Sequence, residues 1–448
     1  MCRHIFPLKL WQQWLHSFIL PNFGQTAIMN TDKDASVYYT AGSAYDSCMV
    51  TTFLKNLFTC CREHTDTPDL VIKKNISAIK SEVDKLNTGN CTELSSAYLA
   101  AVEDSLPDAG VRYALIYKNG APALFVYFQL FSLSTRHFNL QQNKGFMKHI
   151  LSLLLSVKKA KVLVLGNALR TDTQGFSFDA HAMTREEAIA AVAGIAEKLS
   201  ADEHAAAVIL KDLPAITRGG QKMLAGMGYT KPWDDQVMEM AINPEWHTLQ
   251  DYTAVLTRKY KTRANKVLAA AGKLVTKVMD AAEVKHYQPE INKLFATLVE
   301  KQSFTLATAG AGNLAKLKEI YQDSFEVSGI FMDNSLVAFY SAFINEDNYE
   351  LYYIGFDYSL NNEYQLYFNI LFSGLERGII LKKKLLKLGR TSFDAKASIG
   401  ATAKSTDYRI KFLYIPDVAV KWFASYFTAL EDGKWKLRNP LKNNIADA

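Results

Sequence analysis

The sequence predicts an α/β (α+β) fold in which one order of strands and helices occurs twice. Three observations lead to this prediction: the chain is long, its composition is that of a globular protein, and its predicted elements repeat. The 448 residues exceed an ordinary domain of about 100–150 residues. The chain is 49% hydrophobic and 21% charged, unlike disordered sequences. We therefore expect an extension over residues 1–65, a first half over 66–245 and a second half over 246–448.

The charge and the cysteine content narrow the class of protein. The net charge of +6 suits a phosphate-bearing ligand, an RNA or an anionic membrane, without selecting among them. All five cysteines lie within the first 91 residues, so a disulfide framework is excluded for the rest of the chain. Adjacent Cys60 and Cys61 lack the spacing of a zinc site. We expect free thiols, a cytoplasmic location and no metal site.

Residues 1–25 carry apolar side chains at helical spacing, from Leu8 to Ile19, until Pro21 ends the pattern. This stretch is too short and too interrupted to span a bilayer. Three alternatives stay open for it: peripheral contact with a membrane through residues 1–20, docking on the folded body, or an upstream extension before Met29.

The first half is predicted as helices, a hairpin, and then alternating strands and helices. Apolar residues at helical spacing predict helices between Asp66 and Asp104. The turn Lys118-Asn119-Gly120 predicts a β-hairpin, and Thr184 with Glu187 predicts a capping box at a helix start. The other predicted elements are a helix over Met147–Val157, strands over Lys161–Gly166, Val208–Leu210 and Gln236–Ile242, and a helix over Gln221–Gly226.

The same order returns after Pro244, which predicts a duplication. Helical material is expected over Thr248–Met279 and again near Leu294 and Leu317. The turn Asp333-Asn334-Ser335 predicts a second hairpin. The remaining expected elements are strands over Phe325–Met332, Leu336–Ile344, Tyr349–Asp357, Leu385–Gly389 and Arg409–Ile415, and a helix over Gln365–Arg377.

One segment of the second half carries the strongest sign of chemistry. It runs from Leu388 to Ala401 and leads from a predicted strand through Gly389 to Arg390, with Lys396 six residues later. The planar fork of an arginine binds phosphate or carboxylate, and a lysine ammonium can stabilise a developing oxyanion. A solvated loop with both charges in water is the alternative.

A second segment places cations on one stripe of a predicted helix. Lys259, Arg263 and Lys266 fall at i, i+4 and i+7, with Tyr260 and Val267 on the adjoining face. Such a helix can present charge to a phosphate while its apolar face stays anchored. Alternatively, these three cations form only the solvent-exposed face of an ordinary amphipathic helix.

These segments, together with Asn362-Glu363-Tyr364 after the third strand and Gly400-Ala401, resemble the GNAT-superfamily proteins related to the FemAB peptidoglycan transferases. The resemblance spans about residues 66–415. It implies two tandem GNAT-like domains, each a mixed, mainly antiparallel sheet flanked by helices.

The resemblance also implies an activity. A GNAT-like protein transfers an acyl group from a carrier to an amine, so we expect an N-acyltransferase acting on a small-molecule or lipid-linked amine. By position, Arg390 and Lys396 would steady charge at the reacting carbonyl. Acyl-CoA is the expected cosubstrate and aminoacyl-tRNA the alternative carrier. The residues expected to bind the acyl carrier are Tyr358, Asn361, Asn362 and Tyr364. The residues expected to bind the substrate are Tyr353 together with Lys259, Arg263 and Lys266, and these three cations would hold the acceptor or a phosphate of the carrier.

Two features leave alternatives open. The glycine-rich pyrophosphate loop of GNAT enzymes is absent from both halves, which favours a rival in which the chain only binds an anionic ligand. Transfer also needs a base for the amine, and Glu350, Asp357 and Glu363 are candidates that the sequence does not rank. Together with Arg390 and Lys396, Glu350 makes up the predicted set of catalytic residues.

Overall fold

The computed structural model describes eight stretches of the chain. All of them belong to one compact unit, Asp46–Ala448. The predicted extension over residues 1–65 and the predicted helix over Met147–Val157 lie outside them. The described residues are 69–87, 89, 91–106, 109–133, 161–231, 235–300, 313–413 and 435–442.

The first half alternates helices with the strands of one sheet. Its hairpin joins β2 to β3, and a long loop separates β4 from helix α6. The elements are β1 (Asp69–Lys73), α3 (Lys80–Leu86), α4 (Ser96–Ser105), β2 (Ala109–Lys118), β3 (Ala121–Ser132), β4 (Lys161–Leu165), β5 (Phe176–Phe178), α6 (Arg185–Asp202), β6 (Ala205–Leu213), α7 (Arg218–Gly226) and β7 (Asp235–Ala241).

The second half repeats this plan with two additional helices at its start. Its hairpin joins β9 to β10, and its long strand β11 leads into two consecutive helices. The elements are α8 (Leu249–Val255), α9 (Arg258–Ala270), β8 (Val275–Met279), α10 (Ala281–His286), α11 (Gln288–Val299), α12 (Asn313–Tyr321), β9 (Phe325–Met332), β10 (Ser335–Ile344), β11 (Asn348–Phe356), α13 (Tyr358–Tyr364), α14 (Leu366–Ile380), β12 (Leu385–Gly389), α15 (Phe393–Ala397) and β13 (Thr402–Phe412).

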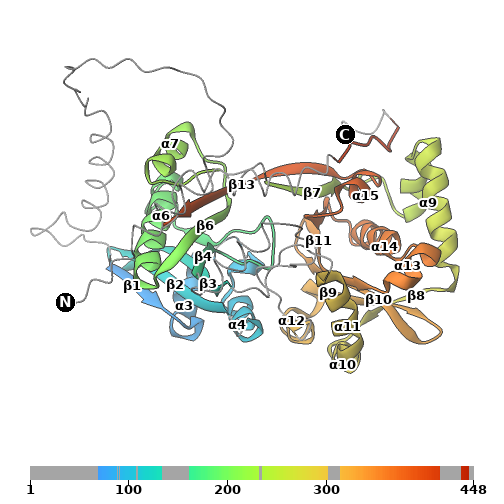
Figure 1. Ribbon diagram of the computed structural model, residues 1–448, viewed down its shortest axis with the longest axis horizontal. Helices are drawn as coiled ribbons and strands as arrows, with labels where there is room; N and C mark the ends of the chain where they lie inside the picture. The colour runs from blue at the N-terminus through green and yellow to red at the C-terminus, as the bar shows by residue number, and fades with distance from the viewer. Residues whose placement is uncertain are drawn as a thin grey trace, which may run out of the picture. The chain divides into compact units, whose positions relative to one another are not determined.

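The strands of both halves form one continuous mixed sheet. Its order is β1-β2-β3-β4-β6-β13-β7-β12-β11-β10-β9-β8, with β5 paired to β3. Strands β13 and β7 of the middle of this order are labelled in Figure 1. Each half has one parallel pair, β4 with β6 and β11 with β12, among antiparallel neighbours. The predicted fold class, two repeats of a mixed and mainly antiparallel sheet with helices, is confirmed.

The last strand of each half pairs with the other half. Strand β7 ends the first half in sequence but lies next to β12, and β13 ends the second half but lies next to β6. The exchanged strands β13 and β7 also pair with each other, and together they lie between β6 and β12. Each half therefore depends on the other for a strand of its sheet.

One hydrophobic core is also shared between the halves. Tyr98 of α4 packs edge-on against Phe343 of β10, with ring centroids 5.8 Å apart, and both side chains are fully buried. The same core contains Tyr113 and Phe125 from the first hairpin and Phe325 from the second. Burial of this apolar surface stabilises the two halves as one body.

The local turn and cap signals gave correct predictions. Asn119 and Gly120 have φ of 52° and 74°, and Asp333 and Asn334 have φ of 48° and 66°, as two-residue hairpin turns require. The capping box at Thr184 forms as predicted, with its hydroxyl and Glu187 satisfying each other's backbone groups.

Two helical predictions are wrong at the edges of the sheet. Residues 275–279, within the stretch predicted as helical up to Met279, form the edge strand β8 on β9. Residues 69–73, within the region predicted as helical, form the opposite edge strand β1 on β2. In both cases β-branched residues pair with a strand that is distant in sequence, and this pairing overrides the local pattern. Strand β13 also begins at Thr402, well before the predicted start at Arg409.

Among the described residues, none of the helices combines the length and the apolar character that crossing a lipid bilayer requires.

Candidate functional site

A row of charged residues crosses the middle of the sheet. Glu350 of β11 lies opposite Lys387 of β12, and Lys387 lies opposite Glu239 of β7. Residues directly opposite each other in neighbouring strands project from the same face of a sheet. Two halves of the chain thus place three charges side by side on one face.

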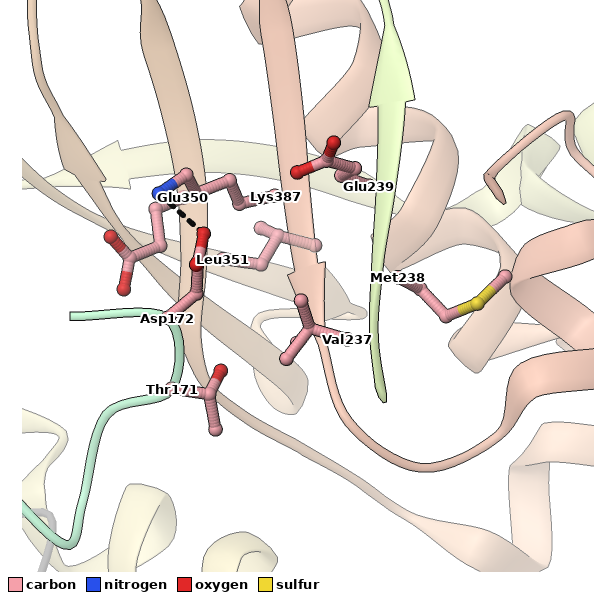
Figure 2. Close-up of a pocket in the computed structure, with 9 residues that line it drawn as sticks. Thr171, Asp172, Val237, Met238, Glu239, Glu350, Leu351 and Lys387 are labelled. Carbon is pink, nitrogen blue, oxygen red and sulfur yellow. Dashed lines mark ion pairs between the residues drawn. The ribbon is translucent and has the colours of Figure 1, made fainter. Parts of the chain in front are cut away.

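The parallel pair of the second half separates at this row. Strands β11 and β12 pair over only three residues each, ending at Glu350 and Lys387, while β11 continues over Leu351–Phe356. A pocket lies at the point of separation (Figure 2). Its lining residues are Thr171, Asp172, Val237, Met238, Glu239, Glu350, Leu351, Lys387 and Gly389.

The loop that follows β4 in the first half is held at both of its ends. Tyr127 of β3 holds both ends of this loop, accepting a hydrogen bond from the Gly166 amide and donating one to the Gly175 carbonyl. The loop between them, residues 167–174, is tied to the end of β6, because Lys211 Nζ donates to the Arg170 carbonyl at 3.1 Å. Thr171 and Asp172 of this loop line the pocket of the second half.

Arg170 of this loop joins the halves through a buried ion pair. Its Nε and Nη2 donate to the two carboxylate oxygens of Glu350, at 3.0 and 2.6 Å. The guanidinium carbon lies 4.0 Å from the centre of the Phe343 ring, and Arg170 is 2% exposed. A carboxylate held at both oxygens by a guanidinium is poorly placed to take a proton from an amine.

Asp172, two residues later, binds two lysines of the sheet. Its carboxylate lies 3.0 Å from Lys387 Nζ, the ion pair drawn in Figure 2, and 3.0 Å from Lys404 Nζ. Burial by itself would raise the pKa of Asp172, but the two lysines outweigh it and the pKa is lowered. Burial by itself would lower the pKa of Lys387, but Asp172 and Glu350 outweigh it and the pKa is raised. Both groups are therefore held in their charged forms.

Arg390 and Lys396, predicted to act together, belong to one tightly wound loop. Gly389, Thr391 and Ser392 all have positive φ, between 52° and 68°. Lys396 is buried in α15, and its Nζ donates to the carbonyls of Gly389 at 3.2 Å and Arg390 at 2.5 Å. Burial lowers the pKa of Lys396 to about 7. In this structure Lys396 contacts the backbone of the loop, and only Gly389 of this loop lines the pocket.

The side chain of Arg390 reaches across to the first half. It forms an ion pair with Asp235, at the start of β7, and its Nη2 lies 3.9 Å from Asp212, at the end of β6. Asp235 also accepts a hydrogen bond from Thr406 at 2.6 Å. Arg390 thus helps to join the exchanged strands to the loop.

The four residues expected to bind the carrier lie on helix α13. Asn361 Oδ1 accepts a hydrogen bond from the Tyr367 amide at 3.0 Å, and the Asn362 carbonyl accepts one from the Gln365 side chain at 2.9 Å. Tyr358 packs on Phe356, with ring centroids 4.4 Å apart, and Tyr364 ends the helix. They shape the turn from α13 into α14.

The cationic stripe of α9 is exposed, as its pattern indicates. Lys259, Arg263 and Lys266 face solvent, while Ala264 and Val267 are buried. The Arg263 guanidinium lies 4.4 Å from the centre of the Phe368 ring, in the first turn of α14. The structure therefore brings Arg263 of the stripe to the same helix start as the residues of α13.

The remaining residues of the predicted site are one buried tyrosine, Tyr353, and two carboxylates at helix α13, Asp357 and Glu363. Tyr353 is buried in β11 and stacks on Tyr352, with centroids 4.1 Å apart. Asp357 caps α13, and the Ser359 hydroxyl is the main cause of its lowered pKa. Glu363 is exposed on the same helix.

Three residues of the pocket region, Arg170, Asp172 and Glu239, were missed by sequence reasoning. The loop from Gly166 to Thr184 lies between a strand and a helix start, a position that suits a pyrophosphate, but nothing in the sequence singles out Arg170 or Asp172 within it. A signal did exist for Glu239, since it is the single charged residue of the apolar stretch from Val237 to Ile242.

Comparisons with known proteins show likeness in structure alone. No model of a protein family matches the chain, and no curated protein matches it. A solved structure of FemX is 8% identical and covers 79% of this chain and 99% of its own, with a TM-score of 0.49. A tandem GNAT protein from the clavulanic acid biosynthesis pathway is 10% identical, covers 77% of this chain and 98% of its own, and has a TM-score of 0.47. A GCN5-related N-acetyltransferase from Kribbella flavida is 9% identical, covers 78% and 72%, and has a TM-score of 0.40. At these identities the likeness concerns the fold. The chain itself has two consecutive repeats of one strand order, each with a central parallel pair.

Proposed function

We propose that the chain is an N-acyltransferase that moves an acyl group from acyl-CoA, or another acyl carrier, to an amine. The observation that carries this proposal is the separation of β11 from β12 beside a charged pocket. Strands that part leave backbone donors and acceptors for a ligand, and the pocket gives the reacting atoms a place beside them.

The length of β11 suits an extended carrier arm. The strand runs on for six residues after its last pair with β12, Leu351–Phe356, which is roughly 20 Å at about 3.3 Å per residue. An arm laid along it would join the pocket to the turn from α13 into α14. There the start of α14 and the Arg263 side chain favour a phosphate group.

The loop from Gly389 to Ser392 has a supporting part in this proposal. Its Gly389 lines the pocket, and Lys396 holds the carbonyls of Gly389 and Arg390 from behind. We assign Lys396 to positioning this loop. The amine acceptor would enter from the side of Asp172 and Glu239.

The proposal is tested by measuring thiol release from acetyl-CoA with a panel of amines, together with calorimetry of acetyl-CoA and CoA. Thr171→Trp, in the loop that lines the pocket, would narrow the pocket and is expected to lower turnover at least about tenfold. Leu437→Trp is the matched control, because Leu437 is 76% exposed. Equal turnover in both variants would remove the pocket from the reaction.

The same measurements separate the two rival functions. Binding of CoA and acetyl-CoA with equal affinity and no thiol release would make the chain a binding protein for an anionic ligand. The exposed cations of α9 are the feature that suits aminoacyl-tRNA as the carrier. That rival predicts a steep loss of RNA binding between low and moderate salt.

A further inference from the structure

The charged residues that line the pocket are not equivalent. Three are carboxylates, Asp172, Glu239 and Glu350, and one is a cation, Lys387. A carboxylate of this lining that has no closely paired cation would attract an ammonium group, which is the form of most alkylamines at neutral pH. The three carboxylates differ in whether a cation of the protein already binds them.

Two of the three carboxylates are already bound within the protein. Glu350 is held at both oxygens by the Arg170 guanidinium, at 3.0 and 2.6 Å. Asp172 is held by Lys387 and Lys404, each at 3.0 Å. Using either one as a base would break a charge-assisted contact between the halves.

Glu239 differs from both. Its Oε2 is buried and accepts no hydrogen bond from any described residue, and the nearest recorded cation, Lys404, is 3.8 Å away. Lys387 lies directly opposite Glu239 on the neighbouring strand, but its ammonium is drawn away to Asp172 (Figure 2). The side chain of Glu239 is 23% exposed, so a ligand can reach it.

We infer that Glu239 is the general base that deprotonates the acceptor amine, a role that rests on the proposed acyl transfer. An ammonium would give one proton to the Glu239 carboxylate, and the neutral nitrogen would attack the carbonyl carbon of the acyl thioester. The C–N bond forms, the C–S bond breaks, and the second amine proton leaves with the thiolate as the free thiol. The products are an amide and a thiol, and the proton on Glu239 returns to solvent.

The exchange of strands explains how this residue reaches the site. Glu239 belongs to the first half in sequence, but β7 pairs with β12 of the second half. The separating strands and the base would therefore come from different halves, and the reaction would need both.

The test compares two acceptors in wild type and in Glu239→Gln, an isosteric change. With acetyl-CoA and an alkylamine, the variant should lose about 100-fold or more of kcat/KM, the usual contribution of a general base. With hydroxylamine, whose nitrogen is neutral at pH 7, it should lose far less. Added formate should restore part of the alkylamine activity of Glu239→Ala. Glu346→Gln, at an exposed carboxylate, is the matched control.

The outcomes separate the inference from the proposed function. Wild type that releases no thiol with any amine overturns the proposed function, and the role of Glu239 falls with it. Wild-type turnover that Glu239→Gln retains overturns the role of Glu239 alone. Equal losses with both acceptors, with no rescue by formate, would show a structural effect and would also overturn it.

Discussion

The guanidinium of Arg170 and the carboxylate of Glu350 form a two-point ion pair, although 180 residues separate them in the chain. Both side chains are buried, at 2% and 6% exposure. Their pairing attaches the loop of the first half to the central strand of the second.

Removal of either partner should destabilise the protein strongly. Arg170→Met or Glu350→Gln leaves a charge in the core without its partner, at a cost of about 3–5 kcal/mol in the free energy of unfolding. The double variant should cost less than the sum of the two, and urea denaturation of all three measures this. The exposed pair of Lys198 and Asp202 is the control, since its loss should cost under about 1 kcal/mol. Additive costs at Arg170 and Glu350 would contradict the prediction.

The exchanged strands predict that neither half folds alone. A fragment of residues 1–245 lacks β13, which pairs with β6, and a fragment of residues 246–448 lacks β7, which pairs with β12. Each fragment would expose an unpaired strand edge and part of the shared core. We expect no cooperative unfolding transition for either fragment by circular dichroism, and recovery of a transition when both are expressed together. A separate cooperative transition for residues 1–245 would disprove this.

The lowered pKa of Lys396 leads us to expect that the free energy of unfolding depends on pH. Burial lowers its pKa in the folded protein to about 7, from an ordinary value of 10.5. Between these values the unfolded chain binds one more proton, so the free energy of unfolding rises with pH, by up to about 1.4 kcal/mol per pH unit. Lys396→Met should remove this contribution, so the variant should gain stability relative to wild type as the pH falls from about 10 to 7. Urea denaturation across this range measures it, and parallel curves for the two proteins would refute it.

The closed ends of the loop over residues 167–174 predict a steric effect at Gly175. A Cβ there would lie 2.7 Å from the Gly166 amide nitrogen, which is backbone and cannot move aside cheaply. Gly175→Ala should therefore lower the free energy of unfolding by about 1–3 kcal/mol. Gly272→Ala is the control, because a Cβ at Gly272 meets no atom within 4 Å. Thermal denaturation of both variants checks the prediction, and equal midpoints would contradict it.

The features that the sequence predicted well are local ones. Asn119-Gly120 and Asp333-Asn334 predict their hairpins because few residues adopt positive φ at low cost. The Thr184 capping box needs only residues within one helical turn. The stripe of Lys259, Arg263 and Lys266 is likewise a property of one helix. Each of these follows from interactions between neighbours in the chain.

The features that it predicted poorly depend on distant partners. Edge strand β8 was expected to be helical. This prediction failed because β8 pairs with β9, which lies some 50 residues later in the chain and leaves no local signal. Arg390 and Lys396, six residues apart, were expected to act together at the reacting carbonyl. Only the structure shows that one reaches Asp235 and the other the carbonyls of its own loop.

The sequence by itself therefore determined the duplicated order of elements, the hairpins and the helix starts, because turn chemistry and hydrophobic period act over a few residues. The tertiary structure alone decided that the halves exchange β7 and β13 and that Arg170 forms an ion pair with Glu350. It also decided that Glu239 lines the pocket of the other half. Long-range strand pairing and the pairing of buried charges select among arrangements that the local pattern permits equally, and they leave no periodic signal along the chain.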